Sequence, residues 1–166
     1  MVAAQEIAQS RHHETVRLLV ADRQAQGIGK AYALRFAREG AHVVVSDVRE
    51  EQAAKVADEC SAIGPEAIAL KVDVADEAST KALAKQTVDH FGRVDVLINN
   101  AGIMPPSLPA LADTDDDTFD RLFAVNVKGT FNTFREAAAR LQPGGRIVNF
   151  STSVTGLALP GYAVYG

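Results

Sequence analysis

A glycine-containing turn near the start of the chain could bind the phosphates of a nucleotide. Gly27, Ile28 and Gly29 follow an apolar run at residues 16–20 and precede a helical pattern. Glycines here let the backbone approach a pyrophosphate, whose charge is favoured at a helix N-terminus. The turn therefore predicts a nucleotide site, and tight packing of helix against strand is the structural alternative.

An acid at the end of the next apolar run supports the same chemistry. Asp47 lies 20 residues after Gly27. A carboxylate in this place can accept hydrogen bonds from both ribose hydroxyls of NAD, and it repels the additional phosphate of NADP. Asp47 therefore predicts NAD rather than NADP as the cofactor, unless it is only an exposed acid in a turn.

Two further groups of polar and small residues follow apolar runs. Asp73 and Val74 end one run, and Asn99 with Asn100, Ala101 and Gly102 ends another. Ligands of parallel sheets bind outside the carboxyl ends of the strands, and a glycine there permits close backbone approach. We therefore expect these residues to line the same cofactor site.

The elements that must hold these residues alternate between strand and helix. Near-continuous apolar runs predict strands at 16–20, 42–46, 67–72, 94–98 and 146–150. Helical spacing predicts helices from 28 to Gly40, over 50–63 and 76–91, and over 114–141 as one short and one long helix, with Thr114 as the N-cap. Ile28, Tyr32 and Phe36 are expected on one face of the first helix. The alternation predicts an α/β fold, a doubly wound, Rossmann-like parallel sheet in three αβα layers.

Length and composition limit the function classes. The chain has 166 residues, which predicts one domain, at 15–166, and the polar character of residues 1–14 predicts a tail before it. A net charge of −4 argues against nucleic acid as a partner, and no apolar stretch is long enough to cross a membrane. Adjacent side chains in His12-His13-Glu14 do not share a helix face, so no metal site is expected. The single cysteine, Cys60, is expected in the core and is consistent with a cytoplasmic location.

The motifs together resemble those of the short-chain dehydrogenase/reductase family. The second half is most similar to 3-oxoacyl-reductase-like members. The resemblance runs from about residue 16 to the last residue, and NNAG before a helix with NVKG is its most specific part. Its pieces are GIG at 27–29, Asp47, DVAD at 73–76, NNAG at 99–102, NVKGTF at 126–131, GRIVNFSTS at 145–153 and PGYAVYG at 160–166.

The resemblance implies hydride transfer between nicotinamide and the carbonyl or alcohol group of a small molecule. Tyr165 would be the general acid and base, and Asn126 would support a proton relay through water. A hydroxyl would orient the substrate oxygen. Family spacing points to Thr152 and the local string points to Ser153, so both remain candidates. The family also forms homo-oligomers through a pair of helices, one of which lies beyond this sequence.

The sequence differs from the family pattern in three places. A lysine expected four residues after Tyr165 would lie beyond Gly166. Asp22 and Arg23 stand where the family has Thr and Gly in the nucleotide turn. The last strand would become an exposed sheet edge, so the domain would be incomplete on its C-terminal side.

These differences set the functional expectation. A family oxidoreductase is expected by lineage, with little turnover from these 166 residues. The alternatives are a non-catalytic nucleotide-binding module and an inactive fragment or assembly partner.

Overall fold

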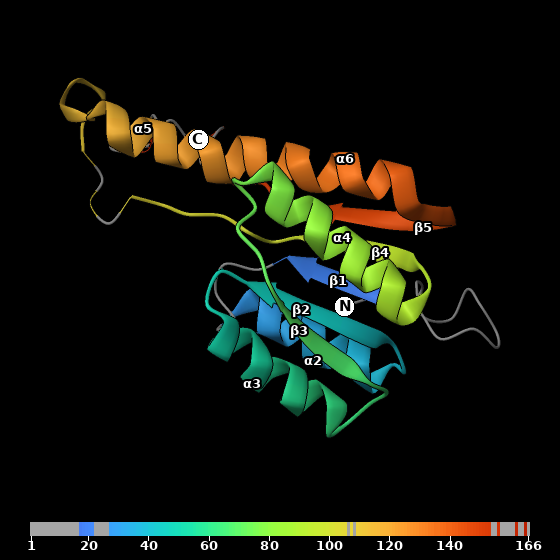
Figure 1. Ribbon diagram of the computed structural model, residues 1–166. Helices are drawn as coiled ribbons and strands as arrows, with labels where there is room; N and C mark the ends of the chain where they lie inside the picture. The colour runs from blue at the N-terminus through green and yellow to red at the C-terminus, as the bar shows by residue number, and fades with distance from the viewer. Residues whose placement is uncertain are drawn as a thin grey trace.

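A five-stranded parallel sheet forms the centre of the molecule (Figure 1). The computed structural model describes residues 17–21, 27–105, 107, 109–153, 156, 162 and 165. The strand order is β3-β2-β1-β4-β5, so the chain moves outward from β1 in one direction and then returns to build the other side. This order confirms the doubly wound fold. The strands are β1 (Arg17–Ala21), β2 (His42–Asp47), β3 (Ala67–Lys71), β4 (Val94–Asn99) and β5 (Leu141–Asn149).

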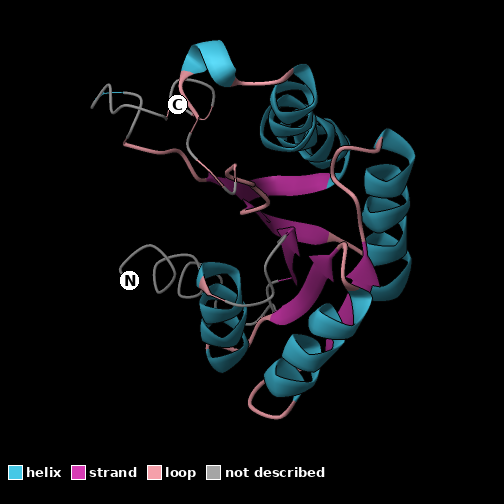
Figure 2. Cartoon of the chain, turned by 90° about the vertical axis from the view of Figure 1, so that its left-hand side faces the viewer, coloured by secondary structure: helices cyan, strands magenta, loops and turns pink. Residues whose placement is uncertain are grey.

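Helices α2 (Ile28–Arg38) and α3 (Glu50–Ser61) cover one face of the sheet (Figure 2). Alternate residues of a strand point to opposite faces. Val43 and Val45 of β2 therefore enter this layer, while Val44 enters the other. The helices meet the sheet through small and apolar side chains: Ala33, Phe36, Ala37, Ala53, Val56, Ala57 and Cys60.

The other face is covered by α4 (Glu77–Phe91) and by a helical segment in three parts. These parts are α5 (Asp116–Leu122), the π-helix η2 (Phe123–Gly129) and α6 (Thr130–Arg140). A single 3-10 turn, η1 (Leu111–Asp113), precedes them. The core of this layer joins Val72, Val74, Leu83, Leu97, Val125 and Ala137. The two layers therefore have separate cores on a shared sheet.

Side-chain caps explain where two helices of the second layer begin. The carboxylate of Asp76 accepts hydrogen bonds from the N–H groups of Ala78 and Ser79, and α4 ends at Gly92 in a left-handed conformation. At α5 the cap is Asp115, whose carboxylate accepts from the N–H of Thr118 at 2.6 Å. The predicted cap, Thr114, is wrong by one residue. The hydroxyl of Thr114 instead donates to the carbonyl oxygen of Ala110 at 3.2 Å, and the aspartate reaches the orphan N–H group with a charged acceptor.

Three other local predictions need correction. The last strand begins at Leu141, five residues before the predicted start, because Leu141 already pairs with Val94 of β4, ahead of an irregularity that ends where Arg146 pairs with Val96. The expected 114–141 helix contains a π-helix and ends at Arg140. Ile28 does not face the sheet, since 61% of its surface is exposed. The buried face of α2 uses Gly29 and Ala33 instead, because small side chains let the helix approach the strands.

Cys60 is completely buried in the layer formed by α2 and α3, as the sequence predicts. Burial raises the pKa of its thiol to about 11, with a smaller contribution from Glu59. The predicted polar tail at 1–14 lies outside the described residues. Among the helices that the structure describes, none is both long enough and apolar enough to pass through a membrane.

Candidate functional site

The nucleotide turn lies where the strand order reverses, beside the carboxyl end of β1. Gly27 is the N-cap of α2 and has φ of 102°, a left-handed value that favours glycine. It offers no side chain to the first turn, and that turn contains no acid. The helix N-terminus is therefore free of a competing anion from its own first turn. Asp22 and Arg23, the unusual residues of this turn, lie outside the described part of the chain.

Asp47 ends β2 at the same edge of the sheet, as predicted, but its side chain is fully buried. One carboxylate oxygen, Oδ1, accepts a hydrogen bond from the N–H of Arg49 at 2.8 Å. The same oxygen lies 3.6 Å from Nε of Arg49, whose side chain is 46% exposed. The sequence alternative of an exposed acid is therefore wrong, and Asp47 has a neighbouring cation.

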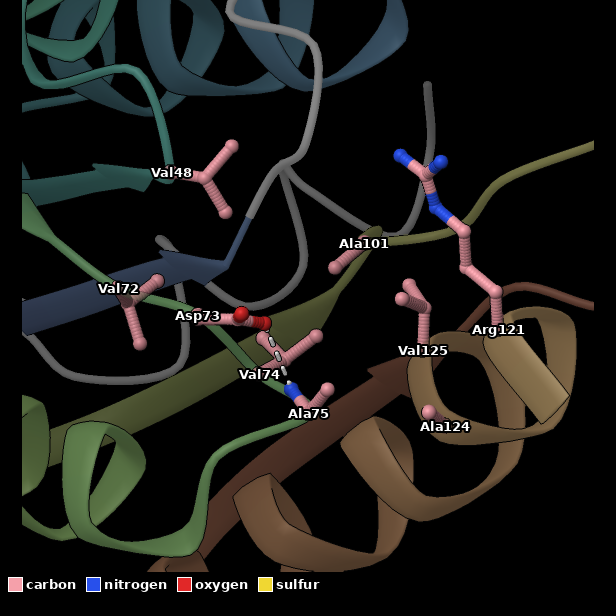
Figure 3. Close-up of a pocket in the computed structure, with 9 residues that line it drawn as sticks. All are labelled: Val48, Val72, Asp73, Val74, Ala75, Ala101, Arg121, Ala124 and Val125. Atoms are coloured by element: carbon pink, nitrogen blue, oxygen red, sulfur yellow. Dashed lines mark hydrogen bonds between the residues drawn. The ribbon is translucent and has the colours of Figure 1, made fainter. Parts of the chain in front are cut away.

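A cavity of about 230 Å³ lies between the ends of the strands and the α5 segment (Figure 3). Figure 3 shows the strand-end residues on one side, Arg121 and Val125 on the other, and Ala101 between them. The walls are mainly aliphatic, and the charged groups are one carboxylate and one guanidinium. The lining residues are Val48, Val72, Asp73, Val74, Ala75, Ala101, Arg121, Ala124 and Val125.

Asp73 holds the turn that forms one wall of this cavity. Its Oδ1 accepts a hydrogen bond from the N–H of Ala75 at 3.0 Å, and its own N–H donates to Oγ of Ser79 at 2.9 Å. The residue is exposed, and it lines the cavity. Its second oxygen, Oδ2, has no hydrogen bond within the described residues. This turn therefore presents a free carboxylate oxygen next to an apolar wall.

Val74 is fixed in this wall by two residues of the overlying helix. Asn132 is 1% exposed, and its Nδ2 donates a hydrogen bond to the carbonyl oxygen of Val74 at 2.9 Å. Gly129 packs so closely that a Cβ atom there would lie 2.6 Å from Cγ2 of Val74. The hydrogen bond from Asn132 and the lack of a side chain at Gly129 thus set the position of Val74 in the cavity wall.

The NNAG residues contribute partly to the cavity and partly to the sheet. Ala101 lines the cavity, whereas Gly102 is exposed at the edge and Asn100 is half-buried. The buried Asn99 donates from Nδ2 to Oδ1 of Asn149 at 2.9 Å, which joins β4 to β5. Within this motif, Asn99 therefore joins two strands of the sheet, whereas Ala101 lines the cavity.

Asn126 lies in η2, and its amide side chain is already engaged. Its Oδ1 accepts from the N–H of Ile103, and its Nδ2 donates to the carbonyl oxygen of Ile103, both at 2.8 Å. Its own carbonyl oxygen accepts from Oγ1 of Thr130 at 2.9 Å. π-Helical turns occur often at functional sites. Here the turn places Asn126 where its amide binds the backbone of Ile103, in the loop that follows β4. A proton relay through Asn126 would therefore use its backbone rather than its amide.

The other predicted catalytic residues are Thr152, Ser153 and Tyr165, and the described contacts do not bring them together around Asn126. Thr152 is half-buried, Ser153 is exposed in a turn, and Tyr165 donates its N–H to the carbonyl oxygen of Tyr162 at 3.0 Å. The rings of Tyr162 and Tyr165 lie 6.2 Å apart. Within the described part of the chain, no hydrogen bond joins Tyr165 to Asn126 or Ser153. The choice between Thr152 and Ser153 stays open.

Sequence reasoning missed most of the cavity lining, including the whole of its far side. Arg121 and Val125 lie one helical turn apart, and this spacing could have placed them on one face. The local sequence pattern does not indicate that this helix face lies opposite the end of β3. The missed lining residues are Val48, Val72, Ala75, Arg121, Ala124 and Val125.

Curated proteins of similar sequence include reductases and dehydrogenases. A probable tetrahydroxynaphthalene reductase from Zymoseptoria tritici is 41% identical over 143 residues, which cover 84% of this chain and 52% of that protein. Versicolorin reductase 1 from Aspergillus parasiticus is 40% identical over 142 residues, covering 84% of this chain and 53% of its own length. The chain thus spans about half the length of these relatives.

Solved structures and a family model agree with this likeness. A short-chain dehydrogenase/reductase from Serratia marcescens has a TM-score of 0.83 and 35% identity, over 93% of this chain and 63% of its own. A putative short-chain alcohol dehydrogenase from Sinorhizobium meliloti also has a TM-score of 0.83, at 27% identity, over 92% of this chain and 60% of its own. The model of the short chain dehydrogenase family matches residues 23–166. The chain therefore belongs to the short-chain dehydrogenase family.

Proposed function

We propose that this chain is the cofactor-binding part of an NAD(P)-dependent oxidoreductase. In this proposal, hydride passes between nicotinamide and the carbonyl or alcohol group of a small molecule. The observation that carries it is the cavity at the carboxyl ends of β3 and β4, which is bounded by Asp73 and Ala101. Two relatives are named as reductases, which favours carbonyl reduction as the direction.

The residues present fit the adenosine part of such a cofactor. Aliphatic walls suit a flat base, and the free Oδ2 of Asp73 can accept a hydrogen bond from an amino group. Helix α2 follows the neighbouring strand β1, and the free N–H groups at the N-terminus of this helix can bind pyrophosphate. Bound nicotinamide would supply the hydride acceptor or donor.

NAD is proposed over NADP because of the charge at the end of β2. The buried carboxylate of Asp47 is poorly screened by salt and repels a 2′-phosphate. Arg49 would attract that phosphate, but its half-exposed side chain is already paired with Asp47. The carboxylate therefore dominates, and we expect tighter binding of NAD than of NADP.

For the 166 residues themselves we propose nucleotide binding without measurable turnover. The observation behind this second candidate is the environment of Tyr165, whose described contacts are with Tyr162 rather than with Asn126 or Ser153. A general acid must lie within hydrogen-bond reach of the group it protonates, together with the residues that orient it. The matched substitution Tyr165→Phe tests this, since equal background rates are expected.

Replacing Asp73 with alanine is expected to weaken NAD binding by at least about tenfold, the loss of one charge-assisted hydrogen bond. Calorimetric titration of the purified chain with NAD and NADP measures this. Asp58→Ala removes another exposed acid, one in α3 that does not line the cavity, and should leave binding unchanged. Failure of the unmodified chain to bind either cofactor would contradict the proposed function.

We also propose that the chain forms a homodimer through the α5–α6 face. Four apolar side chains are exposed at four-residue spacing along this segment: Phe119 (43%), Phe123 (44%), Val127 (55%) and Phe131 (59%). The rings of Phe119 and Phe123 stack at 4.3 Å. A row of exposed apolar side chains supports an interaction site, and a second copy offers the same row across a two-fold axis.

A charge in this row is expected to dissociate the dimer. Phe123→Asp places an unpaired carboxylate in the middle of the apolar contact, which is costly to desolvate. Size-exclusion chromatography with light scattering should then show a monomer in place of a dimer. Ile63→Asp, at an exposed apolar residue after α3, is the matched control and should remain dimeric. A monomeric unmodified chain at the same concentration would rule the dimer out.

A further inference from the structure

The cavity has an arginine on the side opposite its carboxylate. Arg121 lies in α5, one turn before Val125, and both residues line the cavity across from Asp73 (Figure 3). The guanidinium is exposed, and within the described residues it makes neither a hydrogen bond nor an ion pair. A free cation therefore borders a cavity whose other walls are aliphatic apart from the carboxylate of Asp73.

Among the arginines whose side chains the structure describes, Arg121 shares this lack of a partner only with Arg38, which does not line the cavity. Asp117 lies one helical turn before Arg121, at a spacing that favours an ion pair, yet no such pair forms. Arg135 and Arg140 on the following helix do bind nearby glutamates. Other engaged arginines are Arg35, Arg49, Arg93 and Arg146. The side chain of Arg121 is thus available to a ligand in the cavity.

We propose that Arg121 binds the base of an adenosine-containing ligand from the open side of the cavity. This inference rests on the proposed nucleotide site and adds a specificity-determining residue to it. A guanidinium is flat and stacks on aromatic faces, and its N–H groups can donate to the ring nitrogens of a purine. Asp73 Oδ2 accepts from the amino group on the other side. Donor and acceptor on opposite walls match the two kinds of polar group that adenine carries.

A phosphate contact is the competing role for an exposed arginine, and it predicts a different result. Adenosine carries a base and no phosphate, whereas AMP carries both. A residue that acts on the base changes the affinity for both ligands by the same factor. A residue that acts on phosphate changes the affinity for AMP alone, and this effect weakens as salt is added.

The experiment titrates adenosine and AMP into the purified chain and its variants at two salt concentrations. Arg121→Ala is expected to raise the Kd for both ligands by the same factor, about three- to thirtyfold. Arg121→Lys is expected to stay nearer to the alanine variant, because an ammonium group has neither a flat face to stack nor two N–H donors fixed in one plane. Arg38→Ala, an exposed arginine at the far end of α2, controls for net charge and should match the unmodified chain.

Each outcome bears on a separate statement. If the unmodified chain binds adenosine and Arg121→Ala binds it equally well, the role of Arg121 is overturned while the nucleotide site stands. A loss confined to AMP overturns contact with the base in favour of a phosphate contact, and full recovery by Arg121→Lys overturns the need for a flat guanidinium. If the unmodified chain binds neither ligand, the nucleotide site itself fails, and Arg121 with it.

Discussion

Replacing Leu97 with alanine is expected to destabilise the chain by about 2–5 kcal/mol. Leu97 is 0% exposed in β4 and packs in the core between the sheet and the second helix layer. The truncation removes apolar contacts and leaves a cavity that a central strand cannot close. Urea unfolding followed by circular dichroism measures the effect as a lower midpoint with an unchanged slope.

Leu111→Ala is the matched control for this prediction. Leu111 is 66% exposed, so the same chemical change should alter the free energy of unfolding by less than about 0.5 kcal/mol. A similar small effect at Leu97 would mean that the sheet and the α4–α6 layer do not form one cooperative core.

Replacing Asn132 with leucine is expected to affect stability and nucleotide binding together. Leucine has a similar size but cannot donate to the carbonyl oxygen of Val74, which would then be buried without its partner. The expected loss in the free energy of unfolding is about 1–3 kcal/mol. Because Val74 also lines the cavity, we expect a higher Kd for adenine nucleotides under conditions where the variant is folded.

Thr133→Val separates these two effects. Thr133 is also buried in α6, but its hydroxyl donates to carbonyl oxygens of its own helical segment, at Gly129 and Thr130. This variant should lose stability without changing the affinity for nucleotide. If Asn132→Leu behaved in the same way, Asn132 would be a structural residue without a role in positioning the cavity wall.

The fold could be predicted largely from local patterns, since buried parallel strands are nearly continuous apolar runs. The run at Val43, Val44 and Val45 is buried on both faces, which only a strand between two helix layers requires. The start of β5 was harder to predict. Residues 142–145 lack the signals of a strand, and the early pairing of Leu141 with Val94 lies across a register irregularity that no local pattern indicates.

The candidate site was predictable only on the side built from strand ends. Asp73, Val74 and Ala101 follow apolar runs, and the carboxyl ends of parallel strands meet at one edge. Arg121 and Asn132 could not be assigned in this way. Their roles depend on how the α5–α6 segment crosses the sheet, and no short sequence pattern encodes that crossing.

The buried Cys60 gives the chain its own reporter of partial opening. It is the single cysteine, and it lies in the layer of α2 and α3, whereas Val72, Val74 and Val125 of the cavity belong to the opposite core. Only a thiolate reacts with disulfide reagents, and the pKa of about 11 keeps this thiol protonated while it is enclosed. The rate at which a disulfide reagent modifies Cys60 therefore measures how often α3 opens away from the sheet. Comparing that rate with and without nucleotide would show whether a ligand held at one face also restrains the other.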